Sequence, residues 1–209
     1  MDKTKIAAGI FNKYAEQYQD KFMNVEVYGS SFDFFCNDLP PNATVLELAC
    51  GPGNITKYLL NTRPDLKIFG IDLAPNMIAL AKQNNSGAEF FVMDCRDIRS
   101  LHKKYDAVMC GFCLPYLSMK ETEMLVADCS LLLNSGGLIY ISTMEDNYSN
   151  SGLRKGSQGD EIYMHYYLES DLVALLEKSS FKLKNIQRIK SEMTDGAVVT
   201  DLIIISQKI

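Results

Sequence analysis

The sequence predicts an α/β fold built on a seven-stranded, mostly parallel sheet, with helices on both faces and an antiparallel hairpin at its C-terminal end. Three observations lead to this prediction. Apolar runs typical of buried strands alternate with segments of helical period across residues 44–143. The connections between these segments are short, as in a parallel sheet covered by helices. Two long strand-like runs separated only by "SEMTDG" then close the chain, and such a short link requires antiparallel pairing.

Each element follows from its local pattern. The parallel strands are expected at 44–49, 67–71, 88–93, 105–110 and 137–143. The helices between them are expected at 53–62, 75–84, about 97–102 and 119–133. After a long polar connection, a helix at about 169–179 precedes the hairpin strands at 181–190 and 197–207. Asp97 is expected to cap the short helix that follows the third strand.

Composition limits the classes of function. The 209 residues, 47% of them hydrophobic, suffice for one domain with a well-filled core. The net charge of -5, with no basic run, disfavours a nucleic-acid partner. Neither an apolar signal sequence nor a run of eighteen apolar residues occurs, so we expect a cytoplasmic chain with no membrane partner. The six cysteines lie mostly in apolar runs, which favours reduced thiols over a disulfide framework.

The residues that follow the predicted strands indicate a nucleoside site. In an open parallel sheet, ligands bind outside the C-terminal ends of the strands. The first strand leads into Gly51-Pro-Gly53, the second ends at Asp72, and the third ends at Asp94. Asp72 lies 19 residues beyond Gly53, a spacing at which a carboxylate reaches the two ribose hydroxyls.

The phosphate-binding motifs are missing from this turn. A nicotinamide cofactor favours G-x-G-x-x-G, but Thr56 stands at the third glycine position. A P-loop requires Gly-Lys-Ser or Gly-Lys-Thr, and the chain contains neither. An adenosyl ligand without phosphates is therefore predicted.

The chain resembles the class I S-adenosylmethionine-dependent methyltransferases of the small-molecule type, which have a Rossmann-like sheet. "VLELACGPGN" is similar to the first motif of that family, with Ala49 in place of its first glycine. Alanine adds only a methyl group, so the turn is expected to survive if Ala49 keeps a negative φ. "IFGIDLAPNMIALAK", "FFVMDCRDI", "YDAVMCGFCLPYLS" and "LLLNSGGLIYIS" match the later motifs in order and spacing.

The resemblance implies S-adenosylmethionine as the cofactor and assigns it a set of residues. Asp72 is expected to hold the ribose, Asp94 the adenine amine, and Tyr18 to cover the methionine part. The full cofactor set is Tyr18, Glu47, Ala49, Cys50, Gly51, Gly53, Asp72, Leu73, Met77, Asp94, Cys95, Cys110 and Phe112. Residues 1–40 are expected as an N-terminal helical cap and residues 144–168 as a substrate lid.

Methyl transfer from a sulfonium mainly requires alignment in a dry pocket, and a base is needed only if the acceptor must lose a proton. The candidates for that role are Tyr116 and His165, although a histidine among tyrosines is also a common packed residue. Cys110 and Cys113 form a C-x-x-C pair without a second pair, so no metal site is predicted.

Three functions fit these residues. The first is an enzyme that methylates a small molecule. The second is a protein or nucleic-acid methyltransferase of the same fold, and the third is a module that binds S-adenosylmethionine or S-adenosylhomocysteine without catalysis. The fold does not choose among them, because function resides in the acceptor site.

Overall fold

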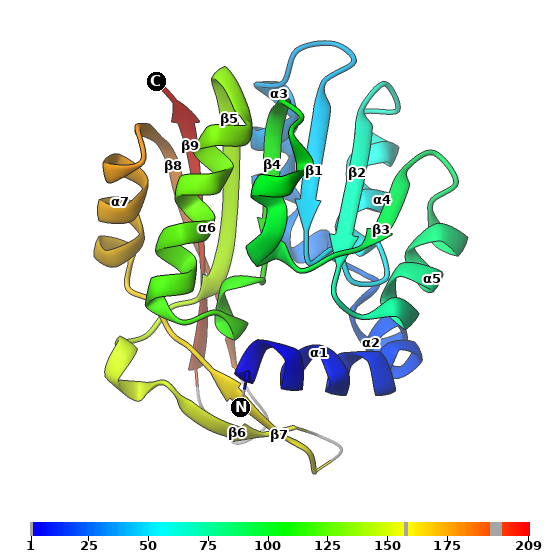
Figure 1. Cartoon of the computed structure of the whole chain (residues 1–209), viewed down its shortest axis with the longest axis vertical. Coiled ribbons are helices and arrows are strands. Elements are labelled where there is room, and N and C mark those ends of the chain that lie inside the picture. The colour runs from blue at the N-terminus through cyan, green and yellow to red at the C-terminus, as the bar shows by residue number, and fades with distance from the viewer. Residues whose placement is uncertain (1, 157–158, 193–197) are drawn as a thin grey trace.

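The central element is a seven-stranded sheet with the order β3-β2-β1-β4-β5-β9-β8 (Figure 1). The computed structural model describes residues 2–156, 159–192 and 198–209. Strands β1 to β5 run parallel, whereas β9 runs antiparallel to both of its neighbours, β5 and β8. The strands of this sheet are β1 Thr44–Leu48, β2 Lys67–Asp72, β3 Glu89–Val92, β4 Tyr105–Gly111, β5 Leu133–Met144, β8 Phe181–Glu192 and β9 Val198–Lys208.

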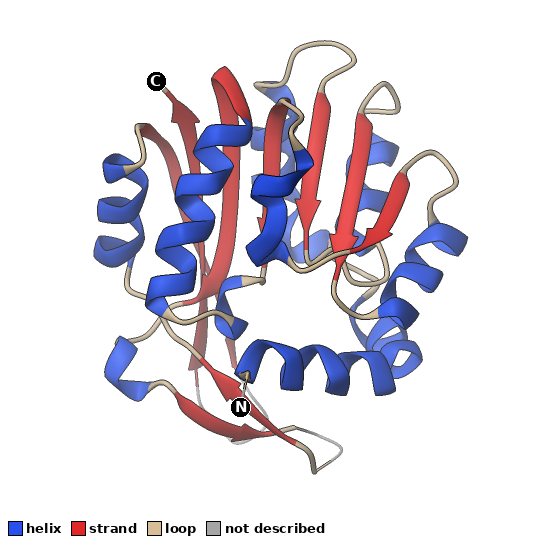
Figure 2. Ribbon diagram, in the orientation of Figure 1, coloured by secondary structure: helices blue, strands red, loops and turns tan. Residues whose placement is uncertain are grey.

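Helices cover both faces of the sheet (Figure 2). Helices α6 and α7 lie on one face, and α3 and α4 lie on the other. The α-helices are α1 Lys3–Lys13, α2 Ala15–Phe22, α3 Gly29–Asn37, α4 Asn54–Thr62, α5 Pro75–Asn84, α6 Met119–Leu132 and α7 Glu169–Lys178. The 3-10 helices are η1 Glu26–Tyr28, η2 Cys95–Leu101, η3 Leu114–Tyr116 and η4 Tyr148–Asn150. Among the residues described, no helix combines the length and apolarity needed to cross a bilayer.

Two apolar cores form because the side chains of β1 alternate between the faces. Leu46 and Leu48 pack beneath α6 and α7, and Val45 packs beneath α3 and α4. Glu47 has the same parity as Val45, so its carboxyl faces α4 in the second core. Because of this alternation, neighbouring residues of the first motif lie on different faces of the sheet.

Local sequence signals set several helix starts. Ser118 and Glu121 form a reciprocal capping box at the start of α6. Pro75 opens α5 at a position where its missing N–H costs nothing. Gly53 precedes α4 with φ of 78°, and a Cβ there would lie 2.3 Å from the Asn85 side-chain nitrogen.

The predicted strands and the C-terminal hairpin are confirmed. Of the predicted turn between β8 and β9, residues 193–196 lie outside the described residues, as do residues 157–158 of the polar connection. The segment 97–102 forms a 3-10 helix that starts earlier, at Cys95. The helical cap is divided, because α1 ends at Lys13 and α2 begins at Ala15.

The sequence did not predict strands between residues 144 and 168. The structure places β6 Gly152–Lys155 and β7 Glu161–Met164 there, paired antiparallel in a separate two-stranded sheet. This hairpin lies beside α1, far from α1 in sequence (Figure 1). Its strands are short and rich in polar residues, so their pattern resembles that of a loop.

Replacing Gly70 with alanine is expected to destabilise the fold by about 1–3 kcal/mol, because overpacking forces neighbouring groups to shift. A Cβ on Gly70 would lie 2.5 Å from a ring carbon of Phe90 and 3.1 Å from the Cys50 sulfur. Urea unfolding measures the effect. Gly87→Ala is the matched control, since its Cβ would make only an ordinary contact of 3.6 Å with Leu60, and an equal loss in both variants would contradict the prediction.

Candidate active site

A cavity opens at the C-terminal ends of β1, β2 and β4, with α1 as its far wall. Figure 1 shows α1 lying across these strand ends. The space, called here the strand-end cavity, measures about 760 Å³ including its open mouth. It brings together ten of the predicted site residues: Tyr18, Ala49, Gly51, Asp72, Leu73, Met77, Asp94, Cys95, Phe112 and Tyr116.

The turn after β1 brings backbone to the cavity through three left-handed residues. Ala49 has φ of 51°, Gly51 of 53° and Gly53 of 78°. The negative φ at Ala49, on which the sequence argument made the turn depend, is therefore not found, and the turn forms with a left-handed alanine. The turn requires the left-handed conformation at every second position, and a residue with a Cβ pays about 1–2 kcal/mol there. Phe112, which follows β4 at the same cavity, is also left-handed at 52°.

Asp72 is fixed by the backbone of the two neighbouring turns. One carboxylate oxygen accepts the Gly51 N–H at 2.9 Å, and the other accepts the Ala74 N–H at 2.8 Å. Burial raises the pKa of Asp72, and these N–H donors oppose that shift. Each oxygen keeps a further lone pair, so the carboxylate can accept hydroxyl protons from the cavity.

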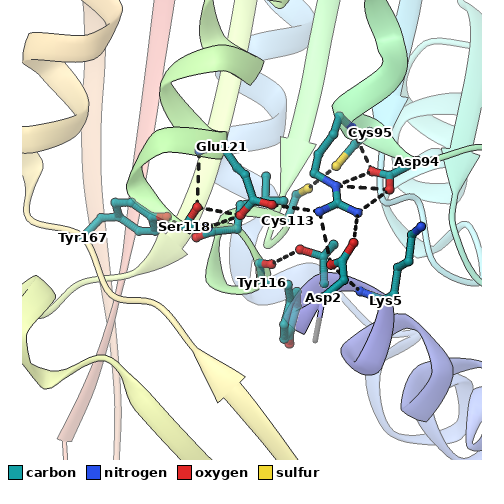
Figure 3. Close-up of polar contacts among 12 residues, drawn as sticks. Asp2, Lys5, Asp94, Cys95, Cys113, Tyr116, Ser118, Glu121 and Tyr167 are labelled. Atoms are coloured by element: carbon teal, nitrogen blue, oxygen red, sulfur yellow. Dashed lines mark hydrogen bonds and ion pairs between the residues drawn. The ribbon is translucent and has the colours of Figure 1, made fainter.

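Asp94 has a role that the sequence did not reveal. Its carboxylate accepts the Arg96 backbone N–H at 3.0 Å and caps η2. The prediction that Asp97 is the cap is wrong, because η2 starts two residues earlier and places Asp97 inside its first turn. Burial opposes ionisation of Asp94, but hydrogen bonds from Arg96 hold its pKa below the usual value. Figure 3 shows Asp94 among these polar contacts.

Aromatic rings form one wall of the cavity. Phe11 packs edge-on against Tyr18 at 5.6 Å and against Tyr116 at 5.0 Å between ring centroids. Burial raises the pKa of Tyr18 to about 12 and also raises the pKa of Tyr116. Both phenols therefore stay protonated at neutral pH, and burial opposes the ionisation that Tyr116 would need to act as a base.

Four residues of the predicted cofactor set are not among those that line the cavity. Glu47 faces α4 and accepts a hydrogen bond from the Thr56 hydroxyl. Cys50 packs beside Phe90, Cys110 lies in the core beneath α6, and Gly53 contributes the turn before α4. Strand alternation separates Glu47 from the cavity.

His165 lies next to the cavity wall and is not among its lining residues. Its backbone N–H donates to the Pro115 carbonyl at 2.8 Å, and its Nδ1 lies 3.2 Å from the Tyr148 hydroxyl. Burial and the charge of Lys3 lower the pKa of His165, so the ring is neutral at pH 7. The Tyr148 oxygen also accepts the Met119 N–H at 3.2 Å, so this hydroxyl joins the His165 ring to the start of α6.

All six cysteines are free and buried. Cys95 and Cys113 line the cavity with their sulfurs 3.6 Å apart. Within the described part of the chain, no group of three histidine, cysteine or acidic residues could hold a metal ion.

The sequence analysis missed one wall of the cavity. Thr4, Ala7, Ala8 and Phe11 of α1 line it, at the spacing of a single helix face. That spacing was visible in the sequence, but three of the four residues are small and carry no chemical signature.

The chain is similar in sequence to known methyltransferases. A family model described as a methyltransferase domain matches residues 45–137. The putative methyltransferase 235L of Invertebrate iridescent virus 6 is 31% identical over 187 residues, which are 78% of this chain and 69% of the viral protein. The malonyl-(acyl-carrier protein) O-methyltransferase of Acetivibrio thermocellus is 28% identical over 157 residues, 70% of this chain and 55% of that enzyme. The chain thus spans about half to two thirds of the length of these relatives.

A solved structure shares the fold over the whole chain. Magnesium protoporphyrin IX methyltransferase from Synechocystis PCC 6803 with bound S-adenosylmethionine aligns over 100% of this chain and 98% of its own, with a TM-score of 0.76 and 14% identity. At that identity, the likeness shows the architecture alone.

Replacing Glu47 with glutamine is expected to stabilise the protein at pH 8 and not at pH 4. Burial raises the pKa of Glu47 to about 7 from an ordinary value of 4.5, so the folded protein keeps a proton that the unfolded chain releases. Below pH 4.5 the carboxyl is protonated in both states and its contribution to the free energy of unfolding is complete. That contribution, about 3 kcal/mol, is lost as the pH rises through 7. Glutamine cannot ionise and still accepts from Thr56.

Urea unfolding across this pH range tests the expectation, with the exposed Glu16→Gln as the control. A difference between Glu47→Gln and the wild type that stays constant with pH would contradict it.

Proposed function

This chain belongs to the class I S-adenosylmethionine-dependent methyltransferases, and from that premise we propose that it transfers the cofactor's methyl group to a small-molecule acceptor. The observation that carries the proposal is the strand-end cavity, where a fixed carboxylate and left-handed backbone meet beside an aromatic wall. Phosphate-binding motifs are missing from the turn, which favours a nucleoside without phosphates.

The residues of the cavity fit an adenosine joined to an amino acid. Asp72 holds free lone pairs at the end of β2, where a ribose would present two hydroxyls. Gly51 has no side chain between the turn and Tyr18, and a Cβ there would lie 3.8 Å from the Tyr18 ring. Gly51 and Tyr18 both line the cavity, and the methionine part would lie against the two of them. Asp94 and Cys95 offer polar groups to the adenine at the end of β3.

The proposed chemistry depends mainly on alignment. The bound cofactor supplies a methyl group on a sulfonium, which is a good leaving group. The chain holds the donor with the carboxylates and backbone, and Phe11, Phe112 and Tyr116 exclude water from the transfer path. Tyr116 serves as a protonated wall residue in this proposal. His165 remains the candidate for proton transfer, acting together with the Tyr148 hydroxyl to which it is hydrogen-bonded.

Two features support a small acceptor over a macromolecule. The net charge of -5, without a basic run, argues against a nucleic-acid surface. The Acetivibrio relative is named for a malonyl group and the Synechocystis structure for a magnesium porphyrin. In this chain, the β6–β7 hairpin contacts α1 at the cavity's far wall, and we assign residues 144–168 to a lid over the acceptor.

Asp72→Ala is expected to weaken cofactor binding by about 1–3 kcal/mol, the cost of leaving a buried hydrogen bond unmade. Titration calorimetry with S-adenosylhomocysteine measures the change. Asp72→Asn keeps an acceptor for the Gly51 N–H and sets an NH2 group against the Ala74 N–H, so it tests the need for a second acceptor oxygen at an unchanged side-chain size. The exposed Asp97→Ala serves as the control. Unchanged affinity in Asp72→Ala would contradict the assignment.

Methyl transfer is tested with labelled S-adenosylmethionine and a cell extract separated by filtration into small molecules and macromolecules. We expect label in the small-molecule fraction. Label confined to protein or nucleic acid would favour the alternative methyltransferase, and cofactor binding without transfer to either fraction would favour a binding module.

A further inference from the structure

Helix α1 covers the cavity but contributes little to the apolar core. Only Ala7 of its eleven residues is buried. Its cavity face consists of Thr4, Ala7, Ala8 and Phe11, which leaves the centre of the helix with little apolar contact to the body. A segment with so few buried contacts opens readily, so its polar contacts decide how firmly it closes over the cavity.

The strongest of those contacts is made to Arg96. Asp2, the N-cap residue of α1, accepts from both terminal nitrogens of Arg96, at 3.2 Å from Nη1 and 2.8 Å from Nη2. The Thr4 hydroxyl adds a hydrogen bond to the Tyr116 carbonyl at 2.8 Å. The start of α1 is thereby tied to both η2 and η3.

The same guanidinium holds the carboxylate at the end of β3. Arg96 Nε lies 3.0 Å from one Asp94 oxygen, and Nη2 lies 2.7 Å from the other. Nη1 also donates to Glu121 of α6 at 2.8 Å. The nitrogens of the fork are thus all used, which a lysine cannot reproduce. Figure 3 shows Asp2, Asp94 and Glu121 converging from separate elements.

Arg96 acts from behind the cavity wall. Asp94 lines the cavity, whereas Arg96 is not among the lining residues. The Asp94 side chain is 10% exposed and the Arg96 side chain 20%, so this pair is shielded from salt more than the Asp2 pair, where Asp2 is 35% exposed. Arg96 therefore fixes the orientation of Asp94 without contacting a ligand.

Building on the proposed cofactor site, we propose that Arg96 is a positioning residue that couples recognition of the adenine amine to closure of α1. The Arg96 guanidinium orients the Asp94 carboxylate toward the amine and also binds Asp2 at the start of α1. One side chain therefore acts on both the adenine contact and the closure of α1. A cofactor base with a carbonyl oxygen in place of the amine would set an acceptor against the oriented carboxylate at that position. Such a base is rejected for as long as Arg96 holds Asp94 in place.

The experiment compares Arg96→Gln with Arg99→Gln, a matched control on the same 3-10 helix whose side chain is 75% exposed and 4.0 Å from Asp128. Calorimetry measures affinity for S-adenosylhomocysteine and for S-inosylhomocysteine, which carries a carbonyl oxygen in place of the amine. Hydrogen exchange reports protection of residues 3–13 by each ligand. Asp2→Asn removes the ion pair between Arg96 and α1 and leaves the ion pair between Arg96 and Asp94 in place.

We expect Arg96→Gln to bind S-adenosylhomocysteine at least about tenfold more weakly, since a hydrogen bond to a charged group is worth that much. Its preference for the adenine ligand should fall, and ligand-induced protection of α1 should be lost. Asp2→Asn should lose the protection and keep the preference. Arg99→Gln should match the wild type in all three measurements.

Two results would overturn the coupling. Equal losses of affinity for both ligands in Arg96→Gln would indicate a merely structural role, and retained α1 protection would break the link to closure. Failure of the wild type to bind S-adenosylhomocysteine would instead reject the proposed cofactor site itself.

Discussion

The site depends on one backbone constraint, the left-handed turn that follows β1. Three alternating residues, 49, 51 and 53, have positive φ, and this reverses the chain within a few residues. The reversal presents the Gly51 N–H to Asp72 at 2.9 Å and begins α4 directly after Gly53. The first two strands are thereby locked together at their tips, where the cavity opens. Strain of this kind is concentrated at functional sites, and Ala49 bears it without the freedom of glycine.

Polar contacts hold the α1 wall of the cavity, where few apolar side chains are buried. The sheet and its covering helices bury a large apolar core, but α1 buries only Ala7. The wall formed by α1 is held by Asp2 and Thr4 at its first turn. This division gives a rigid floor and a more easily opened wall, the arrangement a site needs if a ligand is to enter and then be enclosed.

The carboxylates at the strand ends differ in what surrounds them. Asp72 is held by backbone N–H groups alone, and burial raises its pKa. Asp94 is held by the Arg96 side chain, which lowers its pKa. Asp94 is therefore the more firmly ionised of the two. The first is oriented by the fold of its own loop, and the second by a side chain that also contacts α1 and α6.

The sequence by itself determined the order of strands and helices, the terminal hairpin and the motif turns, because strand runs, helical period and glycine spacing are local patterns. It also indicated Asp72 and Asp94, since residues after parallel strands meet at one edge of the sheet. Only the tertiary structure decided the φ of Ala49, the turning of Glu47 toward α4, the β6–β7 hairpin and the Arg96 network. The Arg96 network joins segments far apart in the chain, such as Arg96 with Asp2, and the other three depend on how neighbouring segments pack in space. No local pattern records such contacts.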